Sequence, residues 1–135
     1  IFELSMGIDR SIYSILEHSY YEDLESKRVV LKLVPQIAPV LVGIFPLVTK
    51  DGLREKAQGI HSELKLDYSV FYDESGSIGR RYRRLEEIGA PFALTIDNQT
   101  MNDDTVTVRY RDSMKQERLS ISDIPKFLDT ILDSK

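Results

Sequence analysis

Hydrophobic positions recur at two different spacings along the chain, and each change of spacing marks an expected element. In the first segment the apolar residues stand at helical intervals, which predicts a helix with one apolar face. Residues 26–39 then mix charges with Pro35 and Pro39, which would interrupt a helix or a strand. We expect this stretch to connect two domains. The helical positions are Ile8, Ile12, Ile15, Leu16, Tyr20 and Leu24.

A nearly unbroken apolar run begins at Val40 and predicts a strand that is covered on both faces of a sheet. Helical spacing follows over 53–64, and residues 68–72 form a second strand-like run. A second helix is expected over 78–88 and a third strand over 91–96. This alternation is typical of parallel strands flanked by helices.

After residue 104 apolar and polar residues alternate strictly, which predicts a hairpin that turns around residues 112–115. Helical spacing returns over 124–132, behind a cap at Ser122 or Asp123. The expected order is a helix, then strand–helix–strand–helix–strand–strand–strand–helix. The chain is therefore expected to belong to the α/β class.

Composition narrows the classes of protein to consider. The length of 135 residues suits one domain, and no apolar run approaches the roughly 18 residues that span a membrane. The chain has no cysteine, which excludes disulfides and Cys-based zinc sites, and its two histidines are too far apart to suggest a metal motif. We expect no metal and a cytoplasmic location. The first residue is not methionine, so we expect a piece of a longer protein.

Arginine is concentrated in one part of an acidic chain. The net charge is -4, yet four arginines fall within residues 80–84, and Arg109 and Arg111 follow. The negative sum argues against a protein that coats nucleic acid without selectivity. A local basic surface is compatible with selective binding of one polyanion.

The segment 73–84 follows a strand and opens a helix, where open α/β sheets bind ligands. It lacks the glycines of a dinucleotide fingerprint and the lysine of a P-loop. Arg80, Arg83 and Arg84 face away from the apolar stripe of the helix, and Arg81 falls at its edge. Two interpretations remain open: the arginines form a solvated face that pairs with neighbouring glutamates, or they hold phosphate, since cations in a first turn oppose the helix dipole.

Arg109 and Arg111 alternate with apolar residues, so we expect them on an exposed, basic sheet face, with an ordinary solvated face as the alternative. His18 and His61 suit surface positions on helices. No Ser-His-Asp set, acid pair or metal cluster is legible. We do not expect this segment to perform chemistry alone.

Residues 73–97, which begin Asp-Glu-Ser-Gly-Ser-Ile-Gly-Arg-Arg-Tyr, closely resemble the stretch that marks the anticodon-binding domain of glycyl-tRNA synthetases of the archaeal, eukaryotic and dimeric bacterial type. Residues 105–118 continue the resemblance. The segment Glu3-Leu-Ser-Met-Gly-Ile-Asp-Arg10 is similar to motif 3 of class II synthetases, although Leu4 replaces the usual proline. The resemblance spans nearly the whole chain.

The resemblance implies a fold and a division into domains. The family's domain is a three-layer, mixed five-stranded sheet flanked by three helices, here preceded by a helix from the catalytic domain. Residues 1–26 would end the catalytic domain, 27–39 would connect, and 40–135 would form the anticodon-binding domain. In motif 3 the glutamate and serine recognise glycine and the arginine contacts ATP, which implies substrate-binding roles for Glu3 and Ser5 and a catalytic, ATP-binding role for Arg10.

The implied partner of the domain is the anticodon of tRNA(Gly). Glycine anticodons carry cytosines at their second and third positions, and a carboxylate can accept a hydrogen bond from the cytosine amino group. Asp73 and Glu74 are therefore the expected base readers, and Tyr82 is expected in the core. Arginines hold phosphates in such complexes. Our candidates are Arg80, Arg81, Arg84, Arg109 and Arg111.

The complete enzyme would be a homodimeric glycine–tRNA ligase that uses ATP with Mg²⁺, glycine and tRNA(Gly). This chain alone is expected to be inactive, because motifs 1 and 2 are not visible in it. The alternative is a related module recruited for protein interaction or as a polymerase accessory, which would keep the core and lose motif 3. A small-ligand α/β enzyme is a third possibility, disfavoured by the absence of a nucleophile or base.

Overall fold

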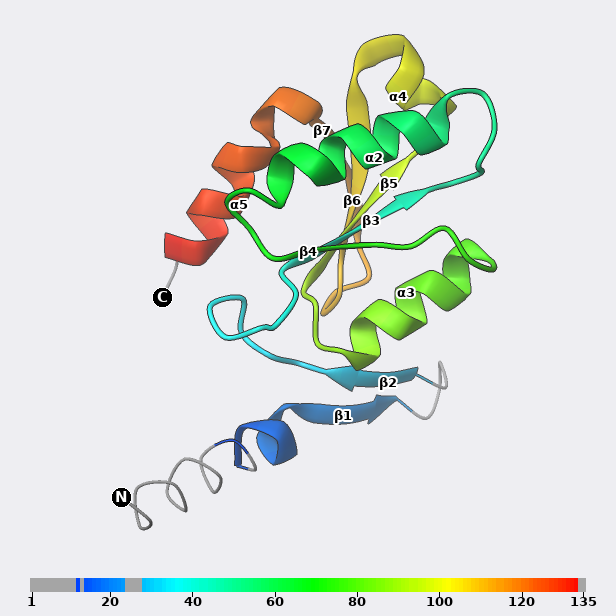
Figure 1. Ribbon diagram of the computed structural model, residues 1–135. Coiled ribbons are helices and arrows are strands. Elements are labelled where there is room, and N and C mark those ends of the chain that lie inside the picture. The colour runs from blue at the N-terminus through cyan, green and yellow to red at the C-terminus, as the bar shows by residue number, and fades with distance from the viewer. Residues whose placement is uncertain (1–11, 13, 24–27, 134–135) are drawn as a thin grey trace.

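The computed structural model describes residues 12, 14–23 and 28–133 (Figure 1). Its centre is a mixed sheet with the strand order β4-β3-β5-β6-β7. The first three strands of this order are parallel, and β6 and β7 continue the sheet antiparallel to β5 and to each other. The bounds are β3 Val42–Pro46, β4 Val70–Tyr72, β5 Phe92–Ile96, β6 Thr105–Tyr110 and β7 Gln116–Ser120.

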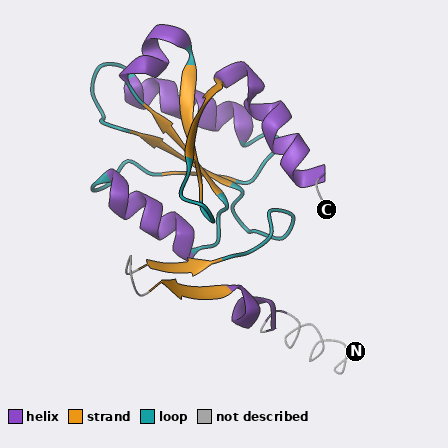
Figure 2. Cartoon of the chain, turned by 180° about the vertical axis from the view of Figure 1, so that it is seen from behind, coloured by secondary structure: helices purple, strands orange, loops and turns teal. Residues whose placement is uncertain are grey.

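Helices cover both faces of the sheet, so the fold has three layers (Figures 1 and 2). On one face α2 (Leu53–Leu64) and α5 (Ile124–Asp133) bury their apolar stripes in the larger core. On the other face α3 (Ile78–Glu87) packs Tyr82 and Leu85 against the sheet in a smaller core. The α/β class and the mixed five-stranded sheet are confirmed.

The strand β3 is buried along its whole length, as its unbroken apolar sequence predicted. Ile44 belongs to the larger core and Phe45 to the smaller one, because successive side chains point to opposite faces. A Cβ added at Gly43 would lie 2.6 Å from Cδ2 of Leu85. The missing side chain thus lets α3 approach the sheet closely.

Gly89 ends α3 and directs the chain back into the sheet. Its φ of 88° lies in the left-handed region. Two backbone hydrogen bonds close the helix here: the Gly89 N–H donates to the Glu86 carbonyl and the Ala90 N–H to the Leu85 carbonyl. This is the Schellman arrangement, in which glycine is favoured. A Cβ here would also lie 2.6 Å from Cδ1 of Leu33, so the position excludes a larger residue.

The N-terminal part differs from the prediction. Residues 14–19 are helical, but β1 (Tyr20–Asp23) pairs antiparallel with β2 (Arg28–Leu31), and this hairpin lies beside α3 (Figure 1). The helix predicted to extend through Tyr20 to Leu24 is therefore wrong over residues 20–23, while Leu24 lies outside the described residues, and the expected irregular connection contains a strand. Apolar spacing predicted neither β1 nor β2, because a hairpin is defined by the pairing of its two strands.

Two short helical elements were also not predicted: α4 (Asn98–Asp103) and the 3₁₀ turn η1 (Ile121–Asp123). The three predicted flanking helices are α2, α3 and α5. Among the described residues, none of the helices has the length and apolar character needed to cross a membrane.

Candidate nucleic-acid interface

The order of the strands reverses at β3, and this creates a crevice at one edge of the sheet. The connection from β3 to β4 runs through α2 on one face, whereas the connection from β4 to β5 runs through α3 on the other. Open α/β sheets bind ligands at such a switch point, outside the carboxyl ends of the strands. A hollow of about 380 Å³ lies there, lined by residues 47–51, Glu74, Gly76 and Arg81.

Asp73 and Glu74 lie at this edge, as expected, but both carboxylates already have partners. Oδ2 of Asp73 lies 2.7 Å from Nη2 of Arg84, and its Oδ1 accepts a hydrogen bond from the Ser75 N–H. One oxygen of Glu74, Oε2, accepts from the Tyr72 hydroxyl at 2.7 Å and from Nε of Arg54 at 2.9 Å.

The Tyr72 hydrogen bond, with help from Arg54, lowers the pKa of Glu74 below its ordinary value. Burial and the same hydrogen bond raise the pKa of Tyr72. Glu74 is therefore ionised and committed to its neighbours at neutral pH. A base that approached Asp73 or Glu74 would compete with these internal contacts, so base reading by either residue stays a prediction.

The exposed side of α3 carries the arginines that are available to an anion. Arg80 and Arg83 are exposed, and their side chains have no hydrogen bond or ion pair in the part of the chain that the structure describes. Arg84 is also exposed, although it is shared between Asp73 and the Ser75 carbonyl. Ser77 caps the helix by accepting from the Arg80 N–H. This side of α3 is a surface to which RNA phosphates could bind.

Arg81 points inward, and its residue is only 3% exposed. Its guanidinium donates to the carbonyls of Pro46 at 2.6 Å, Asp73 at 3.3 Å and Leu47 at 3.4 Å. Burial lowers its pKa, and the neighbouring Asp73 opposes that shift. The structure therefore gives Arg81 a structural task, which is to satisfy the carbonyl groups where β3 and β4 end.

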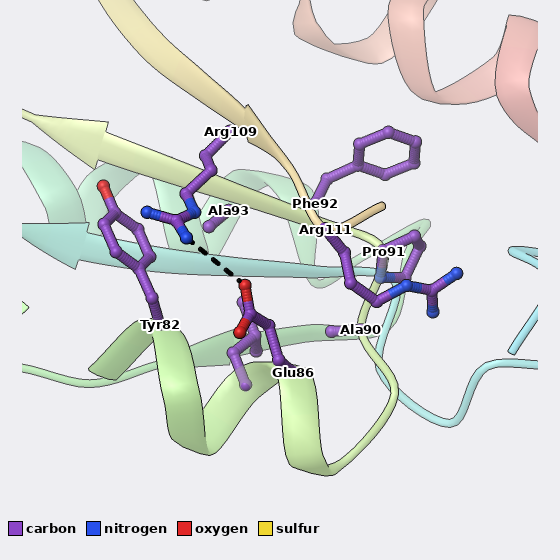
Figure 3. A pocket seen from close by; sticks show the side chains of 9 residues that line it. Tyr82, Glu86, Ala90, Pro91, Phe92, Ala93, Arg109 and Arg111 are labelled. Atoms are coloured by element: carbon purple, nitrogen blue, oxygen red, sulfur yellow. Dashed lines mark hydrogen bonds and ion pairs between the residues drawn. The ribbon is translucent and has the colours of Figure 1, made fainter. Parts of the chain in front are cut away.

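Arg111 is buried too, so the expectation of an exposed basic face at this residue is wrong. Its Nη1 donates to the carbonyls of Leu31 and Gly89, at 3.0 and 2.9 Å, and its Nε and Nη2 bind Asp112. Figure 3 shows its guanidinium pointing away from Arg109. These four bonds use most of its donors and connect β2, the end of α3 and the end of β6.

Arg109 lies between these extremes, with 19% of its side chain exposed. Its guanidinium stands 4.4 Å from the centre of the Tyr82 ring and 3.5 Å from Oε1 of Glu86 (Figure 3). Tyr82 is buried and its hydroxyl bonds to Thr95, so its predicted place in the core is confirmed.

No sequence pattern predicted that Glu86 would be buried. Its Oε1 lies 3.0 Å from Nη1 of Arg28, on β2, and 3.5 Å from Nη2 of Arg109, on β6. Burial raises the pKa of Glu86, while Arg28 and then Arg109 act to lower it. The ion pairs of Glu86 with Arg28 and Arg109 thus join α3, β2 and β6, which are distant in sequence.

Arg118 is a second residue that sequence patterns missed. From β7 it binds Asp97 at 2.8 Å and also donates to Thr105 and Thr107. Because Thr107 pairs with Thr95 and Arg109 pairs with Ala93, these side chains share the sheet face on which α3 lies. The part of that face on β6 and β7 is polar.

The proposed motif 3 residues Glu3, Ser5 and Arg10 lie outside the described residues. Within 12, 14–23 and 28–133, no group of three or more His, Asp or Glu side chains could hold a metal ion. The roles of Glu3, Ser5 and Arg10 stay predictions.

Comparison with known proteins agrees with this arrangement. The family described as "Anticodon binding domain" matches residues 41–131. The chain is 47% identical over 133 residues to a glycine–tRNA ligase of Borreliella burgdorferi, covering 96% of this chain and 30% of that protein. It is 50% identical over 122 residues to a glycine–tRNA ligase of Methanothrix thermoacetophila, covering 88% of this chain and 21% of that one. The chain thus spans less than a third of each relative.

A solved structure of prolyl-tRNA synthetase from Cryptosporidium parvum, complexed with halofuginone and AMPPNP, has a similar fold. The TM-score is 0.67 at 25% identity, over 76% of this chain and 23% of that one. A recruited interaction module is not favoured by these relatives. The chain belongs to the anticodon binding domain family, and it is the form of that domain found in glycine–tRNA ligases.

Proposed function

We propose that this chain holds the anticodon loop of tRNA(Gly) for a glycine–tRNA ligase that makes glycyl-tRNA from ATP, glycine and tRNA. The observation that carries the proposal is the pair of exposed arginines on α3, Arg80 and Arg83, whose side chains have no partner among the described residues, inside the segment that matches the anticodon binding family. Arg84 and Arg109 extend the same basic surface on either side.

The rest of the enzyme is proposed on the same relatives. Residues 1–26 would end a catalytic domain, in which Glu3 and Ser5 bind glycine and Arg10 binds ATP with Mg²⁺. The complete protein would act in the cytoplasm as a homodimer. Residues 27–39, with β2 among them, would join that domain to the anticodon-binding domain of residues 40–135.

Binding of the 135-residue chain to short stem-loop RNAs tests the proposal. We expect tighter binding to a loop with a glycine anticodon than to the same loop with both of its cytosines replaced. If Arg80 and Arg83 each neutralise a phosphate, replacing both by alanine reduces the slope of log affinity against log salt by about 1.4, at roughly 0.7 per contact.

A matched control removes the same charge elsewhere. Lys65 and Lys126 are exposed and lie on the opposite side of the fold, beside α2 and on α5. Replacing both by alanine should leave the salt slope unchanged. Equal effects of the two double variants would show a general charge effect, and the absence of any preference for the glycine anticodon would refute the proposal.

A further inference from the structure

A pocket of about 240 Å³ lies between α3, β6 and β2, on the polar side of the sheet. Its volume is several times the roughly 30 Å³ that one water occupies and is slightly below that of common ligand pockets. Four of its residues stand at positions i, i+3, i+4 and i+7 of α3, so a single strip of that helix faces it. The lining residues are Arg28, Gly79, Tyr82, Arg83, Glu86 and Arg109.

Three buried polar atoms of this lining have no hydrogen-bond partner among the described residues: Oε2 of Glu86 and Nε of both Arg28 and Arg109. The side chains of Glu86 and Arg28 are only 5% and 8% exposed. Both cations bind the same oxygen of Glu86, Oε1, which leaves the other oxygen without a donor. Buried polar atoms are almost always paired, so three unpaired ones around one pocket point to a polar ligand.

The unpaired atoms define the chemistry of that ligand. Oε2 of Glu86 requires a hydrogen-bond donor, and the two Nε groups require acceptors. The exposed edge of cytosine offers this combination, since its amino group is a donor and lies beside ring acceptors, whereas uracil has a carbonyl acceptor in place of the amino group. Among the carboxylates near α3, Asp73 and Glu74 are already bound by Arg84 and by Tyr72 with Arg54.

We propose that this pocket reads one cytosine of the anticodon, with Glu86 accepting a hydrogen bond from the cytosine amino group and Arg109 or Arg28 donating to its ring acceptors. The inference rests on the proposed function and deepens it. Arg83 lines the side of the pocket, is exposed, and has no side-chain partner among the described residues, so it can stack on the base or hold its phosphate. Uracil would place an acceptor against the carboxylate and leave buried atoms unpaired.

The test compares the 135-residue chain and its variants on three stem-loop RNAs: one with the glycine anticodon, and two in which uridine replaces one or the other cytosine. For the unmodified chain we expect binding to weaken by about 5- to 150-fold at the position read by the pocket. Glu86→Gln keeps the shape but presents an amide that can donate to uracil. It should abolish or reverse the preference at that position and retain it at the other.

A second variant blocks the pocket without touching the ion pairs. A Cβ at Gly79 would meet no atom within 4 Å, so Gly79→Leu adds a side chain to open space beside the pocket. We expect it to lose the same cytosine preference. Gly59, an equally open helical glycine on α2, supplies the control variant Gly59→Leu, which should bind like the unmodified chain.

The outcomes separate the inference from the function beneath it. If Gly79→Leu folds, as judged by circular dichroism, and keeps both cytosine preferences at full strength, the inference is wrong while the proposed function survives. The same holds if Glu86→Gln retains full discrimination. If the unmodified chain does not prefer the glycine anticodon at all, the proposed function fails, and the inference fails with it.

Discussion

Replacing Arg81 gives the sharpest test of how the arginine cluster divides between structure and binding. Arg81→Met keeps much of the packing volume but removes the donors to three backbone carbonyls, the shortest contact being 2.6 Å to Pro46. A hydrogen bond from a charged donor contributes about 1.5–3 kcal/mol, and a buried group left unpaired costs about 1–3 kcal/mol.

The longer contacts, at 3.3 and 3.4 Å, contribute less. Releasing the buried guanidinium, whose Nε has no partner in the described part of the chain, offsets part of the loss. The net destabilisation is then roughly 3 kcal/mol. For a chain of this size that corresponds to a fall in Tm of about 10 °C.

The assay is urea unfolding followed by circular dichroism, with Arg80→Met as the matched control. Arg80 is the adjacent residue, and its side chain is exposed and without a partner among the described residues, so its replacement should change stability by less than about 0.5 kcal/mol. In RNA binding we expect the reverse: only Arg80→Met lowers the slope of log affinity against log salt. Unchanged stability in Arg81→Met, together with a lowered salt slope, would refute the structural role.

Two further changes test the packing of α3 and the bonds at the edge of the sheet. Gly43→Ala should cost about 1–3 kcal/mol by thermal unfolding, because its Cβ would lie 2.6 Å from Leu85; an unchanged Tm would contradict this. Burial acts to raise the pKa of Asp97, but hydrogen bonds from Arg118 and Thr100 outweigh it and lower the pKa. The resulting stability is present above the ordinary pKa of 3.8 and is lost as the pH falls through the lowered value. Arg118→Ala should therefore destabilise the chain most at neutral pH and least in acid, and a pH-independent difference would oppose this assignment.

Local patterns predicted the elements that bury a continuous apolar stripe or run. The strand β3 and the helix α2 were found near their predicted places because each must cover a core surface with its own residues. By contrast, α4 is short and polar, and its only sequence signal is the capping box between Asp97 and Thr100. The hairpin of β1 and β2 depends on pairing, which apolar spacing does not record.

The candidate site was predictable in place but not in detail. The segment from Asp73 to Arg84 lies at the switch point because its position follows from strand order. Whether an arginine is exposed depends on backbone carbonyls supplied by other segments, and helical position alone could not show that Arg81 turns inward. Glu86 is the clearest example, since Arg28, one of its two partners, lies 58 positions away.

The hydrogen bonds and ion pairs of Arg111 and Glu86 connect the hairpin of β1 and β2 to α3 and β6. Arg111 joins the carbonyls of Leu31 and Gly89, Glu86 joins Arg28 to Arg109, and Leu33 packs against Gly89. The strand β2 and the residues directly after it are thus held against the anticodon-binding domain at three points. If the chain binds an anticodon loop as proposed, a displacement of α3 by that loop would reach β2 through these contacts.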